Sequence, residues 1–199
     1  VRYADDFVIG CQDMMDAAEL LEDLKVRLAE YKLALHPDKT RLIEFGKSAV
    51  ESRRKKGEPK PETFDFLGFT HICAKARDGR RFKLLRRTIK KRFTAKLKAL
   101  KIELGFRINW SISQVGGWLR AVLNGYYNYF AVPGNLELMG RFRYLLAAIW
   151  IKIIRRRSHK AKMTWEKFTR IIDKWLPRPR AKHPYPNQRC RFDGRTAKA

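Results

Sequence analysis

Charge divides this 199-residue chain into two parts of opposite character. Residues 1–46 carry 6 basic and 10 acidic side chains, whereas residues 47–199 carry 39 basic and 10 acidic ones. The resulting net charge of +25 indicates a polyanionic partner, with nucleic acid favoured over an anionic membrane. The longest apolar run near the C-terminal half, residues 144–151, is too short to span a bilayer. We therefore expect an acidic head that holds metal ions and a basic body that binds phosphates, with a merely soluble basic surface as the alternative.

The cysteines and histidines form no recognisable ligand or disulfide pattern. No pair of cysteines is separated by two residues, and no histidine stands at ligand spacing to a cysteine. A zinc site and a disulfide framework are therefore not expected, and the compartment is expected to be reducing. We interpret these seven residues as structural: Cys11, Cys73, Cys190, His36, His71, His159 and His183.

The acidic head is expected to form part of an α+β sheet domain. Residues 1–10 (VRYADDFVIG) predict a buried β-hairpin with Asp5 and Asp6 at its tip. Because the chain opens at Val1 and a natural N-terminus rarely starts inside a strand, we expect a truncated reading frame. No secretory signal is present. Apolar spacing predicts a helix over residues 13–35 that Asp13 caps, followed by a break at residues 36–38 and a strand over 41–45.

The middle of the chain is expected to hold a loop and a hairpin. Residues 47–63 are polar, contain glycine and prolines, and predict a mobile linker. Residues 64–75 and 81–85 predict strands joined by a turn at Asp78-Gly79, which is a strong hairpin signal.

From residue 86 onward the pattern is helical. Ser111 and Gln114 have the spacing of a capping box, and Asn135 and Thr164 are candidate N-caps. The tail from Pro177 is rich in proline and arginine and lacks apolar periodicity. The expected helices span residues 88–105, 111–131, 136–157 and 164 to about 175.

Asp5 and Asp6 are the candidate metal ligands. Two adjacent carboxylates at a hairpin tip repel each other unless a cation compensates. Magnesium prefers hard oxygen ligands and leaves positions open for phosphates, so a turn that aims both carboxylates at one place suits phosphoryl transfer. The alternative is a solvated turn without a ligand.

Three ordered motifs resemble those of reverse transcriptases. Residues 3–6 (YADD) resemble the catalytic box of that family, residues 33–45 resemble the motif that follows it, and residues 64–69 (FDFLGF) resemble the segment that holds the primer. The resemblance implies an α+β fold in which residues 1–86 form part of a palm, with antiparallel strands and one helix. It also implies an RNA-directed DNA polymerase that uses magnesium and deoxynucleoside triphosphates.

The same resemblance implies roles for single residues. Asp5 and Asp6 would ligate Mg²⁺ as catalytic residues, and Lys39 would donate a proton to the departing pyrophosphate, unless it is an ordinary surface lysine. The primer grip would consist of Phe66, Leu67, Gly68 and Phe69. The family places a third catalytic aspartate before the YADD box, so we expect the two-metal site only in a full-length parent and no polymerisation by this chain alone.

The basic part resembles the maturase, or thumb, domain of group II intron proteins. The segments that carry this resemblance are residues 116–120 (GGWLR), 124–130 (NGYYNYF), 155–160, 163–165, 175–177 and 183–186. It implies an α-helical thumb over residues 87–180 and a basic tail over 181–199. It also implies binding of group II intron RNA and of an RNA template/DNA primer duplex, in a ribonucleoprotein of the bacterial cytoplasm. A homodimer is left open, and an endonuclease domain after the thumb is not expected.

Basic and aromatic side chains are the candidate RNA contacts, because A-form duplexes are recognised through phosphates and shape. Among the aromatic residues of the 124–130 segment, Tyr126 and Phe130 are expected in the core and Tyr127 on the surface, and Trp118 is also expected in the core. Helix-dipole stabilisation is the alternative for the cations at 155–157. The candidate RNA contacts are Arg53, Arg54, Lys55, Lys56, Lys83, Arg86, Arg87, Lys90, Lys91, Arg92, Arg120, Tyr127, Asn128, Arg155, Arg156, Arg157, His159 and Lys160.

Two other functions remain open from the sequence. The chain could act only as a maturase, an RNA-binding splicing cofactor without polymerase activity. It could also be a basic RNA-binding protein of another family, an alternative that the ordered palm motifs disfavour.

Overall fold

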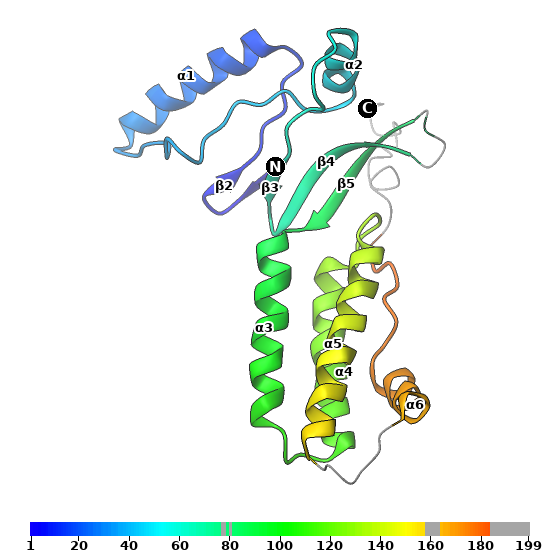
Figure 1. Cartoon of the computed structure of the whole chain (residues 1–199). Helices are drawn as coiled ribbons and strands as arrows, with labels where there is room; N and C mark the ends of the chain where they lie inside the picture. Colours follow the sequence, from blue (N-terminus) through cyan, green and yellow to red (C-terminus); the bar gives the residue numbers. More distant parts are fainter. Residues whose placement is uncertain (77–78, 80, 158–163, 184–199) are drawn as a thin grey trace, which may run out of the picture. The chain divides into compact units, whose positions relative to one another are not determined.

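A computed structural model describes residues 1–76, 79, 81–157 and 164–183, and it confirms a mixed α and β chain (Figure 1). Contacts between residues divide the chain into two compact units. Unit 1 comprises Val1–Phe66 and Ile72–Leu84, and unit 2 comprises Leu67–His71 and Leu85–Ala199. Within the described residues, none of the helices is long and apolar enough to cross a membrane.

The first hairpin of unit 1 forms as predicted, but it is exposed. Strands β1 (Arg2–Tyr3) and β2 (Asp6–Phe7) are antiparallel, with Tyr3 opposite Asp6. The prediction of a buried hairpin is wrong, since Tyr3 is 66% exposed. The physical reason is that β1 and β2 form a sheet of two strands, so among the described residues no further strand covers their apolar side chains.

Helix α1 (Met14–Glu30) is shorter than the predicted helix over residues 13–35. It ends because Lys32 adopts a left-handed conformation, with φ of 58°, which no α-helix can continue through. Asp13 occupies the N-cap position, but its side chain makes no capping hydrogen bond, so that part of the prediction is also wrong. No residue of α1 is buried, although its apolar residues recur at helical spacing.

Two predictions for residues 41–63 are wrong. Residues 41–45 form no strand, and helix α2 (Lys47–Lys55) lies inside the segment expected to be a loop. Three basic side chains occupy its last turn, where cations interact favourably with the helix dipole. The guanidinium of Arg53 also forms an ion pair with Glu44, at 3.2 Å from its Oε2. Charge rather than apolar spacing therefore stabilises α2, and the apolar pattern alone could not reveal it.

A three-stranded sheet follows, in the order β3-β4-β5. Its strands are β3 (Phe64–Phe66), β4 (Phe69–Lys75) and β5 (Phe82–Thr88). The predicted strand over residues 64–75 is in fact two strands, because Leu67 and Gly68 have φ of 48° and 79° and form a two-residue hairpin turn. The Asp78-Gly79 turn predicted between β4 and β5 lies largely outside the described residues.

Unit 2 contains four helices whose bounds agree closely with the predicted ones. They are α3 (Lys90–Phe106), α4 (Ile112–Phe130), α5 (Leu136–Arg157) and α6 (Trp165–Trp175). The capping box is confirmed, since the Gln114 amide donates to Ser111 Oγ and the Ser111 amide donates to Gln114 Oε1. Thr164 likewise caps α6 by accepting from the Lys167 amide at 3.4 Å.

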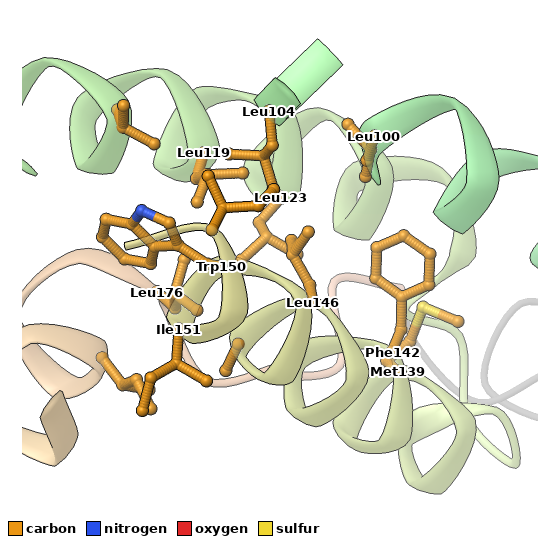
Figure 2. Close-up of a cluster of buried hydrophobic side chains, with 14 of the residues drawn as sticks. Leu100, Leu104, Leu119, Leu123, Met139, Phe142, Leu146, Trp150, Ile151 and Leu176 are labelled. Carbon is orange, nitrogen blue, oxygen red and sulfur yellow. The ribbon is translucent and has the colours of Figure 1, made fainter. Parts of the chain in front are cut away.

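Helices α3, α4 and α5 run side by side, and α6 packs on α4 (Figure 1). Every fourth residue of α4 from 115 to 127 is buried against α5 and its neighbours. At the centre, the ring of Trp150 is 1% exposed and packs edge-on against Phe168 at 5.9 Å. Figure 2 shows this cluster, which includes Leu100, Leu104, Leu119, Leu123, Met139, Phe142, Leu146, Trp150, Ile151 and Leu176.

Asn135 ties the end of β5 to the helices instead of capping α5 with its side chain. The residue is completely buried. Its Oδ1 accepts from the Thr88 amide at 3.2 Å, and its Nδ2 donates to Thr88 Oγ1 and to the Phe130 carbonyl, both at 2.8 Å. The predicted cap is wrong because the side chain uses its hydrogen bonds on these two residues.

Candidate functional site

Asp5 and Asp6 stand at the exposed tip of the β1–β2 hairpin. Since Tyr3 pairs with Asp6, the two-residue turn consists of Ala4 and Asp5, and Ala4 takes the left-handed conformation with φ of 52°. Both carboxylates are exposed, and neither forms an ion pair or a side-chain hydrogen bond with the part of the chain that the structure describes. The hairpin therefore presents two adjacent negative groups to solvent.

The two carboxylates at this tip could supply part of the coordination shell of a single magnesium ion. Carboxylate oxygens are the hard ligands that magnesium takes, and one or two protein carboxylates commonly suffice when phosphates and water complete the shell. No group of three or more possible metal ligands gathers anywhere among the described residues. Asp5 and Asp6 could thus supply the protein ligands of one magnesium ion, whereas two ions would need further protein ligands.

Lys39 lies in an exposed turn of unit 1. The backbone amides of Lys39 and Thr40 both donate to the His36 carbonyl, at 3.3 and 3.0 Å. The ammonium group of Lys39 makes no contact with Asp5 or Asp6 within the described residues. The structure therefore does not bring together the three residues predicted to be catalytic.

The Leu67-Gly68 turn, in contrast, is held firmly within unit 2. The hydroxyl of Tyr129 donates to the Leu67 carbonyl at 2.8 Å, and the Gly68 carbonyl accepts from the Ile89 amide at 3.1 Å. The ring of Phe69 stacks on Tyr129 at 5.7 Å and contacts Phe130 at 5.3 Å. A side chain at residue 68 would meet Arg92 and Phe130, at 3.2 and 3.5 Å from its Cβ, so glycine fits both the conformation and the space. Three of the four predicted primer-grip residues are thereby fixed on α4, whereas Phe66 ends β3 in unit 1.

Replacing Tyr129 by phenylalanine is expected to loosen this turn. Tyr129→Phe keeps the ring that stacks on Phe69 and removes only the bond to the Leu67 carbonyl, which contributes about 0.5–1.5 kcal/mol. The matched control is Tyr144→Phe on α5, whose exposed hydroxyl has no partner among the described residues. Urea denaturation should show a lower free energy of unfolding for Tyr129→Phe alone. Equal values for the two variants would contradict the anchoring role.

On α4, Tyr126 and Phe130 pack against the core as predicted, whereas the predicted surface position of Tyr127 is wrong. Tyr127 is 2% exposed and belongs to the core, whereas Tyr126 is half-buried and Tyr129 is 50% exposed. Tyr127 follows Leu119 and Leu123 at four-residue intervals, and this apolar stripe is the signal that would have placed it inside. Trp118 is half-buried beneath the guanidinium of Arg107, at 4.4 Å, so it only borders the core.

Helix α3 carries a series of exposed basic side chains. Its first turn holds three cations and no acidic residue, although the dipole at a helix N-terminus disfavours cations. These cations therefore gain no stabilisation from the helix dipole where they stand. The exposed basic residues of α3 are Lys90, Lys91, Arg92, Lys96, Lys98 and Lys101.

Other predicted RNA contacts are engaged within the protein. Arg53 bridges Glu44 and Glu58, and Arg120 lies over the Trp175 ring at 5.2 Å and donates to the Lys174 carbonyl. Arg157 donates to the Trp110 carbonyl at 2.6 Å, which ties the end of α5 to the loop before α4. Each of these three arginines therefore already interacts with other residues of the protein.

The remaining basic candidates vary in exposure. Lys83 and Arg86 on β5 are half-buried, and Arg87 lies 3.8 Å from Glu137. Asn128 is exposed, but its carbonyl accepts from His183 Nε2 at 2.7 Å. His159 and Lys160 lie outside the described residues. The exposed basic members are Arg54, Lys55, Lys56, Arg87, Arg155 and Arg156.

Comparison with known proteins bears on the first part of the chain. A family model described as reverse transcriptase (RNA-dependent DNA polymerase) matches residues 1–71, which contain the acidic hairpin and the Leu67-Gly68 turn. No curated protein and no solved structure matches the chain. Residues 1–71 of this chain are thus similar to the reverse transcriptases, the RNA-dependent DNA polymerases.

Proposed function

We propose that this chain is the C-terminal part of a group II intron reverse transcriptase and maturase. The observation that carries the proposal is the exposed Asp5-Asp6 hairpin, which lies inside the region that matches the reverse transcriptase family. The YADD box and the FLGF turn both occur within that region. The 124–130 segment, which resembles the maturase domain, holds the FLGF turn through Tyr129 and Phe130.

In the proposed reaction, Asp5 and Asp6 would be the protein ligands of magnesium. The metal would stabilise the negative charge that develops during phosphoryl transfer. A clamp of two ions needs more donors than two carboxylates, so the chain polymerises only when another segment supplies a further carboxylate. The Leu67-Gly68 turn positions the primer end, and Lys39 supplies a proton to the leaving pyrophosphate.

Unit 2 binds RNA in this proposal. The cations in the first turn of α3 face no acidic residue of that turn and bind the phosphates of the intron or of the template–primer duplex. Binding of the unspliced intron in the bacterial cytoplasm would stabilise its folded, splicing-competent form. A maturase without polymerase activity is the second candidate, and it is favoured by the presence of only two adjacent carboxylates at the hairpin tip.

Binding of RNA across a salt series tests this function. A folded group II intron RNA is compared with an unrelated structured RNA of equal length. We expect a steep salt dependence for both and tighter binding of the intron. Equal affinity for the two RNAs would contradict the maturase assignment, and weak binding with little salt dependence would contradict RNA binding altogether.

A charge-matched pair of variants locates the interface. Replacing Lys90, Lys91 and Arg92 by alanine should lower the salt slope by about 2, since each phosphate contact on a single strand contributes about 0.7. The control replaces Lys25, Arg27 and Lys32 of the acidic head, which removes the same charge. Equal slopes for the two triple variants would show that α3 is not the RNA-binding surface.

A further inference from the structure

Unit 2 contains a groove. Among the residues predicted to contact RNA, Tyr127 alone lines it. Its volume is about 580 Å³, which lies within the ~300–1,000 Å³ typical of ligand sites. Asn124 and Tyr127 line it from α4, and Asp173 lines it from the end of α6. The other wall is formed by residues between 176 and 182, most of which lie in the proline- and arginine-rich tail.

The chain after α6 is fastened so that this wall keeps its shape. Arg143 Nε donates to the Leu176 carbonyl at 3.0 Å, where α6 ends. Farther along, the Lys182 amide donates to the Ala131 carbonyl at 3.0 Å, and His183 Nε2 donates to the Asn128 carbonyl. Figure 1 shows this segment, in orange, returning along the helices. Pro177 and Pro179 restrict the backbone between the two attachments.

The groove carries an excess of positive charge. Arg178, Arg180 and Lys182 line it and are exposed, and Asp173 is the acidic residue among its lining residues. Asp173 is already neutralised from within the protein, because Arg143 donates to its Oδ1 at 3.0 Å. Arg178 lies 3.7 Å from the same oxygen. Arg180 and Lys182 have no acidic partner among the described residues and are therefore available to an anion.

The groove also offers uncharged polar groups beside these cations. The hydroxyl of Tyr127 is buried and has no hydrogen-bond partner among the described residues, although a buried polar group normally has one. Burial raises the pKa of Tyr127 to about 12, against the opposing effect of Arg143, so the hydroxyl keeps its proton at neutral pH. Asn124 adds an exposed amide from the preceding turn of α4.

We propose that this groove binds the sugar–phosphate backbone of a single-stranded RNA segment, with phosphates on Arg180 and Lys182 and a ribose 2′-hydroxyl against Asn124 and Tyr127. Cations bind phosphates, and hydrogen bonds to the 2′-hydroxyl distinguish RNA from DNA. The inference rests on the proposed RNA-binding function and assigns it a second, separate site on unit 2.

Two pairs of variants of the whole chain test the groove, with fluorescence anisotropy of a labelled twelve-residue oligouridylate as the measurement. The first pair consists of two double variants. Arg180→Ala/Lys182→Ala changes the groove, and Lys167→Ala/Arg170→Ala is the control at exposed positions of α6. We expect the groove variant to bind at least about tenfold more weakly at 0.1 M salt and to lose about 1.4 from the salt slope. The α6 variant should change affinity by less than about threefold.

The second pair separates recognition of ribose from attraction by charge. Tyr127→Phe removes one hydroxyl from the groove, and Tyr126→Phe removes a buried hydroxyl of the neighbouring residue, which does not line the groove. Tyr127→Phe should weaken RNA binding by about two- to tenfold and leave binding of the matching oligodeoxyuridylate unchanged, as expected for one neutral hydrogen bond. Tyr126→Phe should change neither affinity.

Each contrary result has a distinct meaning. The wild-type chain could bind RNA with a steep salt dependence while the Arg180/Lys182 and Lys167/Arg170 variants lose equal affinity. That result would overturn the groove assignment and leave the proposed function intact. Competition by polyglutamate as strong as that by RNA would show a general polyanion surface and would also overturn the groove assignment. Absence of RNA binding by the wild-type chain would overturn both the groove and the proposed function.

Discussion

Gly116→Ala is expected to destabilise unit 2 by about 1–3 kcal/mol, even though it places a better helix former inside α4. A methyl group at residue 116 would lie 2.5 Å from both Cγ and Cδ2 of Trp175, far inside van der Waals contact. These atoms are at the root of the indole, so the ring cannot turn away, and α6 itself must move. The loss of packing between α4 and α6 outweighs the ~1 kcal/mol that removal of a helical glycine returns.

The adjacent glycine supplies the control. A methyl group at Gly117 would approach Trp175 only to 4.0 Å, which is an ordinary contact. Gly117→Ala should therefore stabilise the protein by about 0.5–1 kcal/mol through helix propensity alone. Denaturation in urea, followed by tryptophan fluorescence, measures both values. Two alanine variants that shift the midpoint in the same direction would show that Trp175 does not pack on Gly116 in solution.

This contact shows how the sequence motifs of unit 2 relate to one another. Gly116 and Arg120 belong to one motif that resembles the maturase domain, and Trp175, which they both contact, belongs to another. His183, from a third, meets Asn128 of the 124–130 segment, and Tyr129 of that segment meets Leu67. The motifs lie far apart in the sequence and meet in space. Many of their residues therefore determine the fold, and fewer are free to contact RNA.

Local signals predicted the helices of unit 2 well. Ser111 and Thr164 mark helix starts through side-chain bonds to nearby amides, and such bonds depend on a few neighbouring residues. The turn at Leu67-Gly68 required a glycine with φ of 79°, but the prediction placed it inside one continuous strand. The apolar character of Phe66 and Phe69 on either side concealed the turn.

Long-range contacts explain what the sequence could not predict. The bond from Tyr129 to the Leu67 carbonyl joins residues 62 positions apart, and no local pattern indicates it. Asn135 was predicted to be an N-cap because asparagine is common at that position. Its side chain instead hydrogen-bonds Thr88, which lies 47 positions away in the sequence. In unit 1, the apolar residues of the first hairpin and of α1 predicted burial, but the described residues provide no surface that covers them. Burial depends on a partner surface as well as on the apolar pattern.

If the proposed function is correct, Asp5→Asn combined with Asp6→Asn is expected to abolish DNA synthesis when this chain is supplemented with the N-terminal half of a reverse transcriptase. Both carboxylates stand exposed at the tip of one hairpin, inside the region similar to reverse transcriptases. Amides keep the size of the side chains but bind magnesium far more weakly than carboxylates do. Because metal ions supply several kcal/mol of transition-state stabilisation, primer extension should fall by a factor of about 10³ or more.

The control for this experiment is Asp13→Asn with Asp23→Asn, which removes the same charge from exposed positions outside the hairpin. Asp13 makes no side-chain capping bond, so its loss leaves α1 in place. We expect this variant to extend primers at the wild-type rate over a magnesium titration. Retained synthesis by the Asp5/Asp6 variant would refute the metal-binding role of the hairpin, and robust synthesis by the unsupplemented chain would refute the need for a further carboxylate. Loss of synthesis together with unchanged RNA binding would separate the two units by function, with catalysis at the hairpin and RNA binding on unit 2.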